Sequence, residues 1–355
     1  MKLKGNKGEW SELYTFFKLL ADGRLYCGDG HLNRYDDRFY PILEIFRNDS
    51  PNRNSYKVQI SNHILITGPN INIEVSQEQF KQEANRLLEH IKKMDKKSNF
   101  AYLEPFMDLI DCKSIKAKSS DKADIRIVIH NLRTGSKPEL GYSIKSKLGA
   151  DSTLINSNKD GTNFIYKIKG ISSKNAKEFN SLDKFKIKFE YLKSIEATIS
   201  YHKTANATLH KNLTLLDLGL EKIIAHCLID YYSGNGRTIA DITNHISVAD
   251  PLNIIDDTDQ PMYEYKIKQF LLAFALGMTC TTPWYGTFQA NGGYIVIKED
   301  GDIVCYHFFD RNDLEDYLFH NTRFETPSTS RHQFGNIYEE DGEYYLKLNL
   351  QVRFK

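Results

Sequence analysis

The sequence is poor in the features that mark several large protein classes. Its 355 residues contain five scattered cysteines and nine prolines, and no two cysteines form a CxxC pair. Paired histidines and cysteines at zinc-ligand spacing are also missing, so neither a disulfide framework nor a zinc site is indicated. No apolar window approaches the length that spans a bilayer. We therefore expect a cytoplasmic protein of a reducing compartment that has no contact with a membrane.

Nucleotide-binding signatures are missing as well. The chain has no GxxxxGKS or GxxxxGKT segment, so nucleotide-driven translocation is not indicated. It has no glycine-rich turn between a strand and a helix, which weighs against a cofactor-bearing DNA methyltransferase. Basic and acidic residues number 47 and 46, and this balance gives no overall signature of a nucleic-acid binder.

The composition is that of a globular protein. Hydrophobic residues make up 41% and charged residues 26%, which leaves little room for long disordered tracts. The length suits one large domain or two of ordinary size. Charge is unevenly distributed, because nine basic residues and three acidic ones lie between Lys113 and Lys147. Such a segment is either a solvated surface or a contact region for nucleic acid.

Hydrophobic periodicity predicts a helix followed by a meander of strands in the N-terminal part. Apolar residues recur at helical spacing from residue 7 to 22, and Gly23 can end this helix. Four strand-like runs follow, FYPILEIF, SYKVQIS, HILITG and INIEVS, separated by turn residues. Ser76 can then cap a second helix, with Gln79 completing a capping box.

The central and C-terminal parts combine hairpins with helices. DIRIVIHNL, the turn RTGSKPE and LGYSIKSK predict a hairpin. Beyond about residue 195 helical patterns take over, followed by a hairpin that turns at Asp300 and Gly301 and by one long strand in EYYLKLNLQVRF. We expect a mixed α/β protein with a first domain at 1–195 and a second region at 196–355, a C-terminal helical and β-hairpin elaboration.

One face of the central hairpin carries groups that can do chemistry. Strand side chains alternate, so Ser143, Lys145 and Lys147 share a face. Asp124 starts the preceding strand, opposite the end of this one. An acid able to bind a divalent metal would then lie beside a cation able to position water. The alternative interpretation is an ordinary surface pair across two strands.

Hydrolysis of a phosphodiester needs this combination of groups. Magnesium prefers several hard oxygen ligands, so a second acid should accompany Asp124. Glu139 has the same parity as Ser143 but lies roughly 13 Å along the strand from it. Glu12, which borders the apolar stripe of the first helix, and Glu9 are better candidates.

Several long strings of the sequence resemble a known family. GNKGEWSELY near the start, DIRIVIHNLRTGSKPELGYSIKSKLG and STLINSNKDGTNFIYKI in the middle, and TPSTSRHQFGNIY with LKLNLQVRF near the end look like the HpaII-type family of type II restriction endonucleases. The resemblance covers most of the chain in order. It implies a PD-(D/E)xK restriction-endonuclease-like core, in which a mixed sheet is flanked by helices.

The resemblance also implies roles for the hairpin residues. Asp124 would be the metal-binding aspartate, Lys145 the catalytic lysine and Ser143 the stand-in for the second acid. Glu12, or else Glu9, would be the helix glutamate that helps to hold Mg²⁺. The sequence departs from the superfamily pattern in two ways: no proline precedes Asp124, where it reads KAD, and Ser143 replaces the usual acid.

Two further segments are candidates for DNA contact. The polar segment STLINSNKDGTNF could donate hydrogen bonds to phosphates or bases, or it could be a polar loop leading into a helix. In TPSTSRH, Arg331 is the choice for base readout because arginine binds guanine bidentately, although it could instead pair with an acid of YEEDGE. The residues expected to contact DNA are Lys147, Ser152, Thr153, Asn156, Lys159, Asn163, Ser328, Ser330, Arg331 and His332.

The resemblance implies an Mg²⁺-dependent restriction endonuclease that cuts both strands of double-stranded DNA at a short palindromic, CCGG-like site. It also implies a companion DNA methyltransferase that protects host DNA at the same site. A two-fold symmetric homodimer and a monomer acting twice are both open. Two other functions stay open: a structure-selective PD-(D/E)xK repair nuclease, and a noncatalytic DNA-binding protein in which Ser143 marks a decayed site.

Overall fold

The computed structural model describes residues 3–47, 53–116, 123–256 and 259–355. The chain forms two compact units. Unit 1 comprises Met1–Ser152 and Gln289–Tyr317, and unit 2 comprises Thr153–Phe288 and Leu318–Lys355. Within the described part of the chain, no helix combines the length and the apolar character needed to cross a membrane.

The first helix, α1 (Lys7–Asp22), begins and ends where the sequence predicts. The Asn6 side chain accepts the N–H of Glu9, and the Glu9 carboxylate accepts the N–H of Asn6, which makes a reciprocal capping box. Gly23 ends the helix with a φ of 62°, a left-handed conformation that glycine adopts without steric cost. Local sequence therefore determines both ends of α1.

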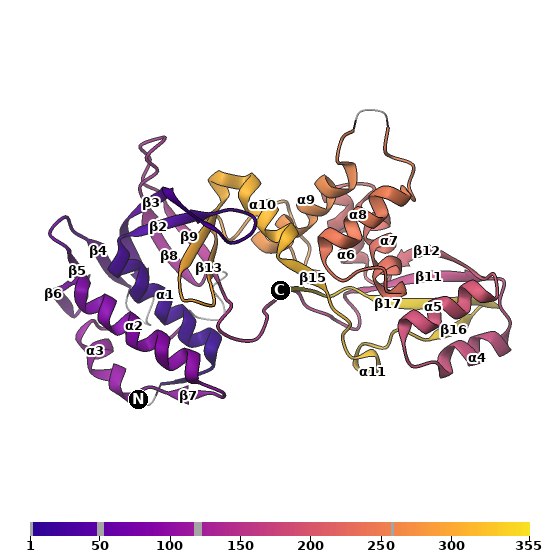
Figure 1. The fold of residues 1–355 in the computed structure, drawn as a ribbon, viewed down its shortest axis with the longest axis horizontal. Helices are drawn as coiled ribbons and strands as arrows, with labels where there is room; N and C mark the ends of the chain where they lie inside the picture. Colours follow the sequence, from indigo (N-terminus) through magenta and orange to yellow (C-terminus); the bar gives the residue numbers. More distant parts are fainter. Residues whose placement is uncertain (1–2, 48–52, 117–122, 257–258) are drawn as a thin grey trace. The chain divides into compact units, whose positions relative to one another are not determined.

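Unit 1 contains further helices, 3-10 turns and two short strands besides α1 and its main sheet. Ser76 caps α2 as predicted, since its Oγ accepts the N–H of Gln79 at 3.2 Å, and α2 lies beside α1 (Figure 1). These elements are α2 (Gln77–Lys93), α3 (Glu104–Leu109), the 3-10 turns η1 (Ala101–Leu103) and η2 (Phe308–Asp310), and the paired strands β1 (Lys4–Gly5) and β7 (Ser98–Asn99); α10 (Arg311–His320) begins in unit 1 and ends in unit 2.

The main sheet of unit 1 has nine strands. They are β2 (Arg24–Gly28), β3 (Arg34–Arg47), β4 (Asn54–Val58), β5 (His63–Gly68), β6 (Ile71–Ser76), β8 (Ile125–Ile129), β9 (Glu139–Ser146), β13 (Gly293–Ile297) and β14 (Ile303–His307). Their order is β2-β14-β13-β9-β8-β3-β4-β5-β6, and a further pairing of β2 with β3 closes the sheet on itself. The predicted meander from β3 to β6 and the β8–β9 hairpin are confirmed as antiparallel.

The sequence suggests that the hairpin of β13 and β14 belongs to a C-terminal elaboration, but this prediction is wrong. The hairpin returns to unit 1, where β13 pairs with β9 in parallel. Parallel and antiparallel pairs therefore coexist in one sheet, and the mixed α/β class is confirmed. The physical reason is that β13 and β14 are buried on every residue, so each needs strand neighbours and cover on both faces.

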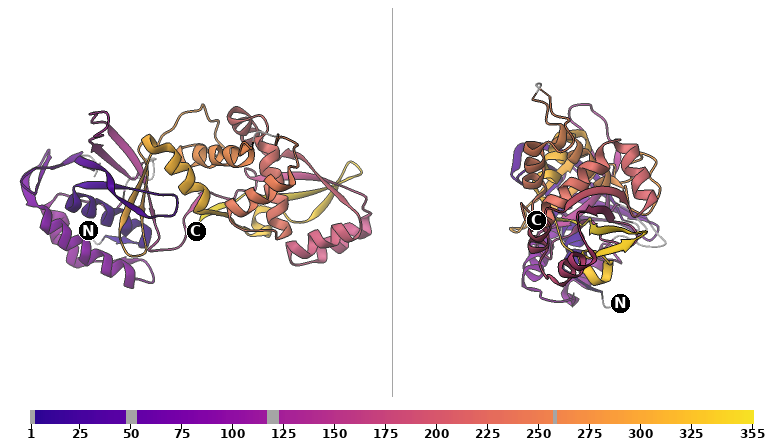
Figure 2. Two further views of the ribbon diagram at one scale, coloured as in Figure 1. Left: turned by 45° about the horizontal axis from the view of Figure 1, so that its top comes forward. Right: turned by 90° about the vertical axis from the view of Figure 1, so that its right-hand side faces the viewer.

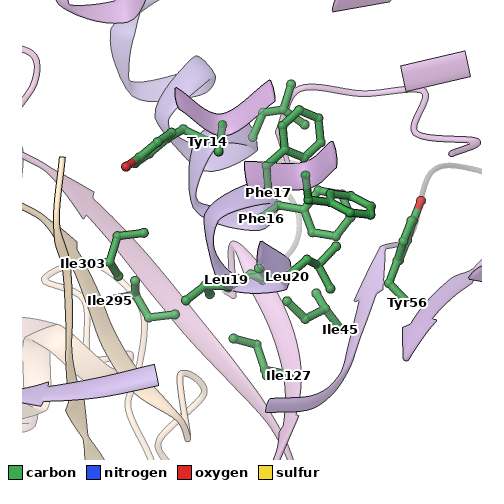
Figure 3. Close-up of a cluster of buried hydrophobic side chains, with 14 of the residues drawn as sticks. Tyr14, Phe16, Phe17, Leu19, Leu20, Ile45, Tyr56, Ile127, Ile295 and Ile303 are labelled. Carbon is green, nitrogen blue, oxygen red and sulfur yellow. The ribbon is translucent and has the colours of Figure 1, made fainter. Parts of the chain in front are cut away.

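The core of unit 1 lies between α1 and the sheet. Phe16, Phe17 and Leu20 of α1 are fully buried in one cluster with Ile45 and Tyr56 from the meander (Figure 3). The ring of Phe16 packs edge-on against that of Tyr56, with centres 4.8 Å apart. Each such side chain contributes about 1.5–3 kcal/mol when buried. This packing holds α1 on the sheet that carries the candidate site.

In the described residues of unit 2, two smaller sheets are accompanied by six helices of two turns or more. One sheet has the order β12-β11-β17-β16 and the other β10-β18-β15. The strands are β10 (Thr153–Ile155), β11 (Asn163–Lys169), β12 (Thr198–Thr204), β15 (Thr322–Phe324), β16 (Ile337–Glu340), β17 (Glu343–Asn349) and β18 (Val352–Phe354). The helices are α4 (Ser173–Ser181), α5 (Phe185–Ser194), α6 (Ala207–Leu216), α7 (Leu220–Ser233), α8 (Ile239–Ala249), α9 (Met262–Leu276) and the short α11 (Thr329–His332). In Figure 2 the yellow strands β16 and β17 continue the sheet that contains β11.

The division of the chain differs from the expected boundary at residue 195. The chain enters unit 2 after Ser152, because β11 pairs with both β12 and β17. The single long C-terminal strand is also a wrong prediction. It breaks after Asn349, where the N–H of Leu350 donates to the carbonyl of Thr162 at 2.9 Å, and β18 then joins the other sheet.

Candidate active site

The β8–β9 pairing brings Asp124 to Ser143. Ile125 is paired with Tyr142, and the N–H of Asp124 donates to the Tyr142 carbonyl at 2.8 Å. Asp124, one residue before β8, is therefore held at the same level of the sheet as Ser143. This confirms the predicted placement of the acid beside the face that carries the serine and the lysine.

The carboxylate of Asp124 is fixed by two donors from β9. Its Oδ2 accepts the backbone N–H of Ile144 at 2.7 Å and the hydroxyl of Ser143 at 3.2 Å. Both donors hold the carboxylate in one orientation. They also use the same oxygen, so the arrangement leaves Oδ1 for another ligand. Ser143 acts here as a donor that orients the acid.

Lys145 lies two residues after Ser143 in β9 and is half-buried. Burial lowers the pKa of its ammonium, and the charges of Asp124 and Glu12 oppose this effect. Its Nζ lies 5.1 Å from the centre of the Tyr294 ring, in the range of a cation–π contact. Lys145 thus shares one electrostatic environment with both candidate metal-binding acids.

Glu12 reaches this environment because α1 is attached to β9, the strand that carries Lys145. The hydroxyl of Ser11 lies 2.9 Å from that of Ser146, the last residue of β9. Ser11 is completely buried, and its hydroxyl also donates to the carbonyl of Lys7 at 2.7 Å. Glu12 follows directly and is half-buried, as expected of a residue at the border of the apolar stripe.

Glu9 is already engaged at the start of α1. Its carboxylate accepts the N–H of Asn6 at 2.9 Å and binds the ammonium of Lys116 at 2.6 Å. The hydrogen bond from Lys116 is the largest cause of a lowered Glu9 pKa. Of the two predicted glutamates, Glu12 is the one whose charge acts on Lys145.

Magnesium binds oxygen ligands, and carboxylates are the protein groups that supply them here. Among the described residues, no group of three or more histidine, cysteine or acidic side chains is close enough to hold a metal ion. Two carboxylates, those of Asp124 and Glu12, are nevertheless adequate for Mg²⁺, which keeps several waters and takes ligands from substrate phosphates. The residues fit such an open site and do not fit a closed, all-protein one.

The residues predicted to bind DNA fall into both units. Lys147 follows β9 in unit 1, and its N–H donates to Ile297 at 2.9 Å. Ser152 is the last residue of the first segment of unit 1, and Thr153 opens β10 in unit 2. Asn156 and Lys159 are exposed in the loop that follows. Their side chains are accessible, as a DNA contact requires.

Asn163 has a different environment. Its side chain is 2% exposed, and both amide hydrogens are used, toward the carbonyls of Lys159 at 2.8 Å and His332 at 3.1 Å. Its Oδ1 accepts from Asn349 at 2.7 Å. These bonds fix the loop after β10 and the end of α11 to the sheet of unit 2, which is a positioning role.

The second predicted segment forms α11 and its cap. The hydroxyl of Ser328 accepts the N–H of Arg331 at 3.4 Å and lies 3.2 Å from that of Ser330. His332 Nε2 lies 3.1 Å from the Ser157 hydroxyl, which joins the two predicted segments. Arg331 is exposed. The two segments that the sequence separates by more than 150 residues are therefore neighbours.

Sequence reasoning missed Tyr294 as a neighbour of Lys145. Tyr294 is paired with Ser143 in the β9–β13 register, and its ring is almost completely buried. Burial raises its pKa, and the charge of Asp124 adds to this effect. The hairpin that carries Tyr294 is recognisable in the sequence, but no local pattern says which strand it will join.

Comparison with known proteins gives a consistent result. The family described as HpaII restriction endonuclease matches residues 6–354 of the chain. The type II restriction enzyme HpaII of Haemophilus parainfluenzae is 42% identical over 353 residues, which cover 99% of this chain and 98% of that enzyme. No solved structure matches. The similarity spans both units and includes every candidate residue.

Proposed function

The chain belongs to the HpaII restriction endonuclease family, and we propose that Asp124, Glu12 and Lys145 carry out its phosphodiester hydrolysis together with a divalent metal. It is a type II restriction endonuclease, a site-specific deoxyribonuclease. The observation that supports the assignment is the Asp124 carboxylate, which is held at 2.7 Å by the N–H of Ile144, one residue before Lys145.

Magnesium is the proposed metal. When bound, it would neutralise charge on the scissile phosphate and lower the pKa of the attacking water. Asp124 and Glu12 would hold it through carboxylate oxygens, with water and a phosphate oxygen completing the coordination. Ser143 keeps Asp124 in the required orientation through its hydrogen bond to Oδ2. Ser143 thus supports the proposed metal-binding Asp124 from the position at which the PD-(D/E)xK motif has its second acid.

Lys145 has the position to align the attacking water. Burial lowers the pKa of its ammonium while the charges of Asp124 and Glu12 oppose this effect, and a lysine in this place can donate to a water or a phosphate oxygen that enters the site. Tyr294 packs against the Nζ and restricts where it can point. On this proposal the three residues form a PD-(D/E)xK type of site. Ser143 stands where the motif has its second acid, and Glu12 of α1 supplies that carboxylate instead.

The substrate follows from the family. We propose a short palindromic, CCGG-like site in double-stranded DNA, cut in both strands. A pair of chains related by two-fold symmetry would match such a site, since each chain could then serve one half. A companion methyltransferase that acts on the same sequence, and a cytoplasmic location beside the genome, belong to the same proposal.

The test is a digestion of plasmid DNA of known sequence by the purified chain. Cleavage should need Mg²⁺, stop with a chelator, and give ends that map to one palindrome. Lys145→Ala should reduce the rate by about 10²- to 10⁴-fold. The matched control is Lys137→Ala, an exposed lysine in the turn of the same hairpin, which should cut at the normal rate. A smear that ignores sequence and persists in Lys145→Ala would refute the proposed site.

A further inference from the structure

The β12-β11-β17-β16 sheet of unit 2 has one packed face and one open face. Phe164 and Tyr166 of β11 and Leu346 and Leu348 of β17 are all completely buried on the packed face. The hydroxyl of Tyr166 donates to the carbonyl of Ala225 in α7 at 2.8 Å, so helices cover this side. The alternate residues must therefore point to the other side.

The open face carries lysines around an apolar centre. Ile165 is paired with Lys203 on one side and with Lys347 on the other. These residues lie at the floor and sides of a hollow of about 820 Å³. Its lining also includes His202, Gln333, Tyr338 and Tyr345.

A bulge in β12 increases the number of polar side chains in this hollow. Ile165 is paired with Lys203 but the next residue, Tyr166, is paired with Tyr201, so His202 is the extra residue. In a regular strand, neighbouring side chains point to opposite faces. Here His202 and Lys203 both line the hollow. Bulges often redirect a side chain beside a functional site.

A second hollow, of about 420 Å³, continues the first toward α11. Gln333, Tyr338 and Lys347 line both hollows. Lys347 Nζ lies 5.1 Å from the centre of the Tyr338 ring, which orders the lysine on the border between them. Thr329 and Ser330 of α11 line the second hollow, so the surface extends to the segment that contains Arg331.

Gln333, which borders both hollows, has a left-handed backbone conformation. Its φ of 50° lies in the left-handed region, which costs a residue other than glycine some free energy. This conformation ends α11, and the exposed side chain of Gln333 lines the shared border. The residue that ends α11 therefore lies at the border of the two hollows.

The charges of the surface are mixed. The larger hollow is lined by three lysines, Lys159, Lys203 and Lys347, and by four acids, Asp160, Glu339, Glu340 and Asp341. A surface that binds only the phosphate backbone would be uniformly basic. Base edges of G·C pairs present both kinds of partner: guanine O6 and N7 accept hydrogen bonds, and cytosine N4 donates to a carboxylate.

We propose that this surface, formed by Lys203, Gln333, Tyr338 and Lys347, reads base edges of the DNA site. The proposal rests on the proposed function, because it assumes that the chain recognises a duplex sequence. Lys347 and Lys203 are the donors to guanine, Gln333 is an adaptable amide, and Glu339 or Glu340 accepts from cytosine. The surface determines specificity and takes no part in the hydrolysis.

The experiment measures binding of two short duplexes by fluorescence anisotropy in a chelator, so that no cleavage occurs. One duplex carries the site mapped from the plasmid digestion, and the other carries the same bases with the site scrambled. Lys347→Gln should bind the specific duplex about 10- to 100-fold more weakly and the scrambled duplex almost normally. Lys203→Gln, at an exposed position, should lose specificity in the same direction.

The matched control is Lys167→Gln. Lys167 lies on the same open face of β11, but it pairs with Glu343 at 2.8 Å and lines neither hollow. It should leave both affinities unchanged, and thermal unfolding should show that all variants are folded. Equal loss for both duplexes would indicate a phosphate contact, and normal binding by both hollow variants would indicate no contact; either result overturns the proposal.

Failure of the two proposals can be told apart. If the unaltered chain neither cuts the plasmid nor distinguishes duplexes, the proposed function fails and base readout fails with it. If the chain cuts at one palindrome and Lys347→Gln and Lys203→Gln keep full discrimination, only the surface proposal is wrong.

Discussion

The stability of unit 1 should depend on one buried histidine. His307, the last residue of β14, is 0% exposed. Its ring packs against those of Tyr40 and Phe309, with centres 4.7 and 4.4 Å away, and edge-on against Tyr142 of β9. Its Nδ1 accepts the N–H of Phe309 at 2.8 Å. This packing suits the neutral imidazole and has no room for a hydrated cation.

The pKa of His307 is lowered from 6.5 to about 4, mainly by burial, with Asp310 raising it and Arg133 lowering it further. Between these two pH values the unfolded chain binds a proton that the folded chain does not. Stability therefore falls as the pH falls through this window. A gap of about 2.5 pH units, at about 1.4 kcal/mol each, gives about 3.5 kcal/mol that is present above pH 6.5 and is mostly lost by pH 4.

The assay is urea unfolding, followed by circular dichroism, of the unaltered chain and of His307→Asn across this pH range. Asparagine keeps an acceptor for the N–H of Phe309 but cannot titrate, and it loses the ring packing at every pH. The difference in unfolding free energy between the two proteins should therefore shrink by about 3 kcal/mol from pH 6.5 to pH 4. His31→Asn, at an exposed position in unit 1, is the control.

Parallel pH curves for the unaltered chain and His307→Asn would refute this reasoning. They would mean that His307 takes up a proton as easily in the folded chain as in the unfolded one. A difference that grows toward low pH would be a stronger contradiction, since it would require the folded chain to prefer the imidazolium.

Two other substitutions test separate parts of unit 1. Asp310→Asn removes the charge that binds the Tyr40 hydroxyl and Arg133, both at 2.6 Å, and should lower the unfolding free energy by about 2 kcal/mol in thermal or urea unfolding; an unchanged midpoint would mean that the cluster contributes nothing. Ser143→Ala removes one of the two donors to Asp124 and should slow single-turnover cleavage less than about tenfold, because the Ile144 N–H remains. A loss as complete as that of Lys145→Ala would make Ser143 a metal ligand itself.

Much of unit 1 could be predicted because its signals are local. The periodicity of α1, its cap at Asn6 and its stop at Gly23 define that helix within a few neighbouring residues. The β8–β9 hairpin is likewise defined by its alternation and turn, and the side-chain parity on β9 places Ser143 and Lys145 together. Asp124 follows from the pairing, since a short hairpin permits few registers.

The remaining features depend on pairing between distant segments. Nothing in the sequence of β13 says that it will lie parallel to β9 and bring Tyr294 to Lys145. The break after Asn349 is set by a bond to Thr162, almost 190 residues earlier, so the alternation of the final strand is misleading. The bulge at His202 is equally invisible, because it is a property of two strands and not of one.

The structure gives Ser143 a role that its sequence position alone does not show. As a mere substitution for an acid it suggests a lost site, but its hydroxyl shares Asp124 Oδ2 with the Ile144 N–H. A carboxylate in its place would face that of Asp124 and would have no proton to donate to it. On the proposed function, the second carboxylate is then best supplied by Glu12, which the contact of Ser11 with Ser146 brings to β9. The packing of α1 on the sheet thereby becomes part of the catalytic apparatus.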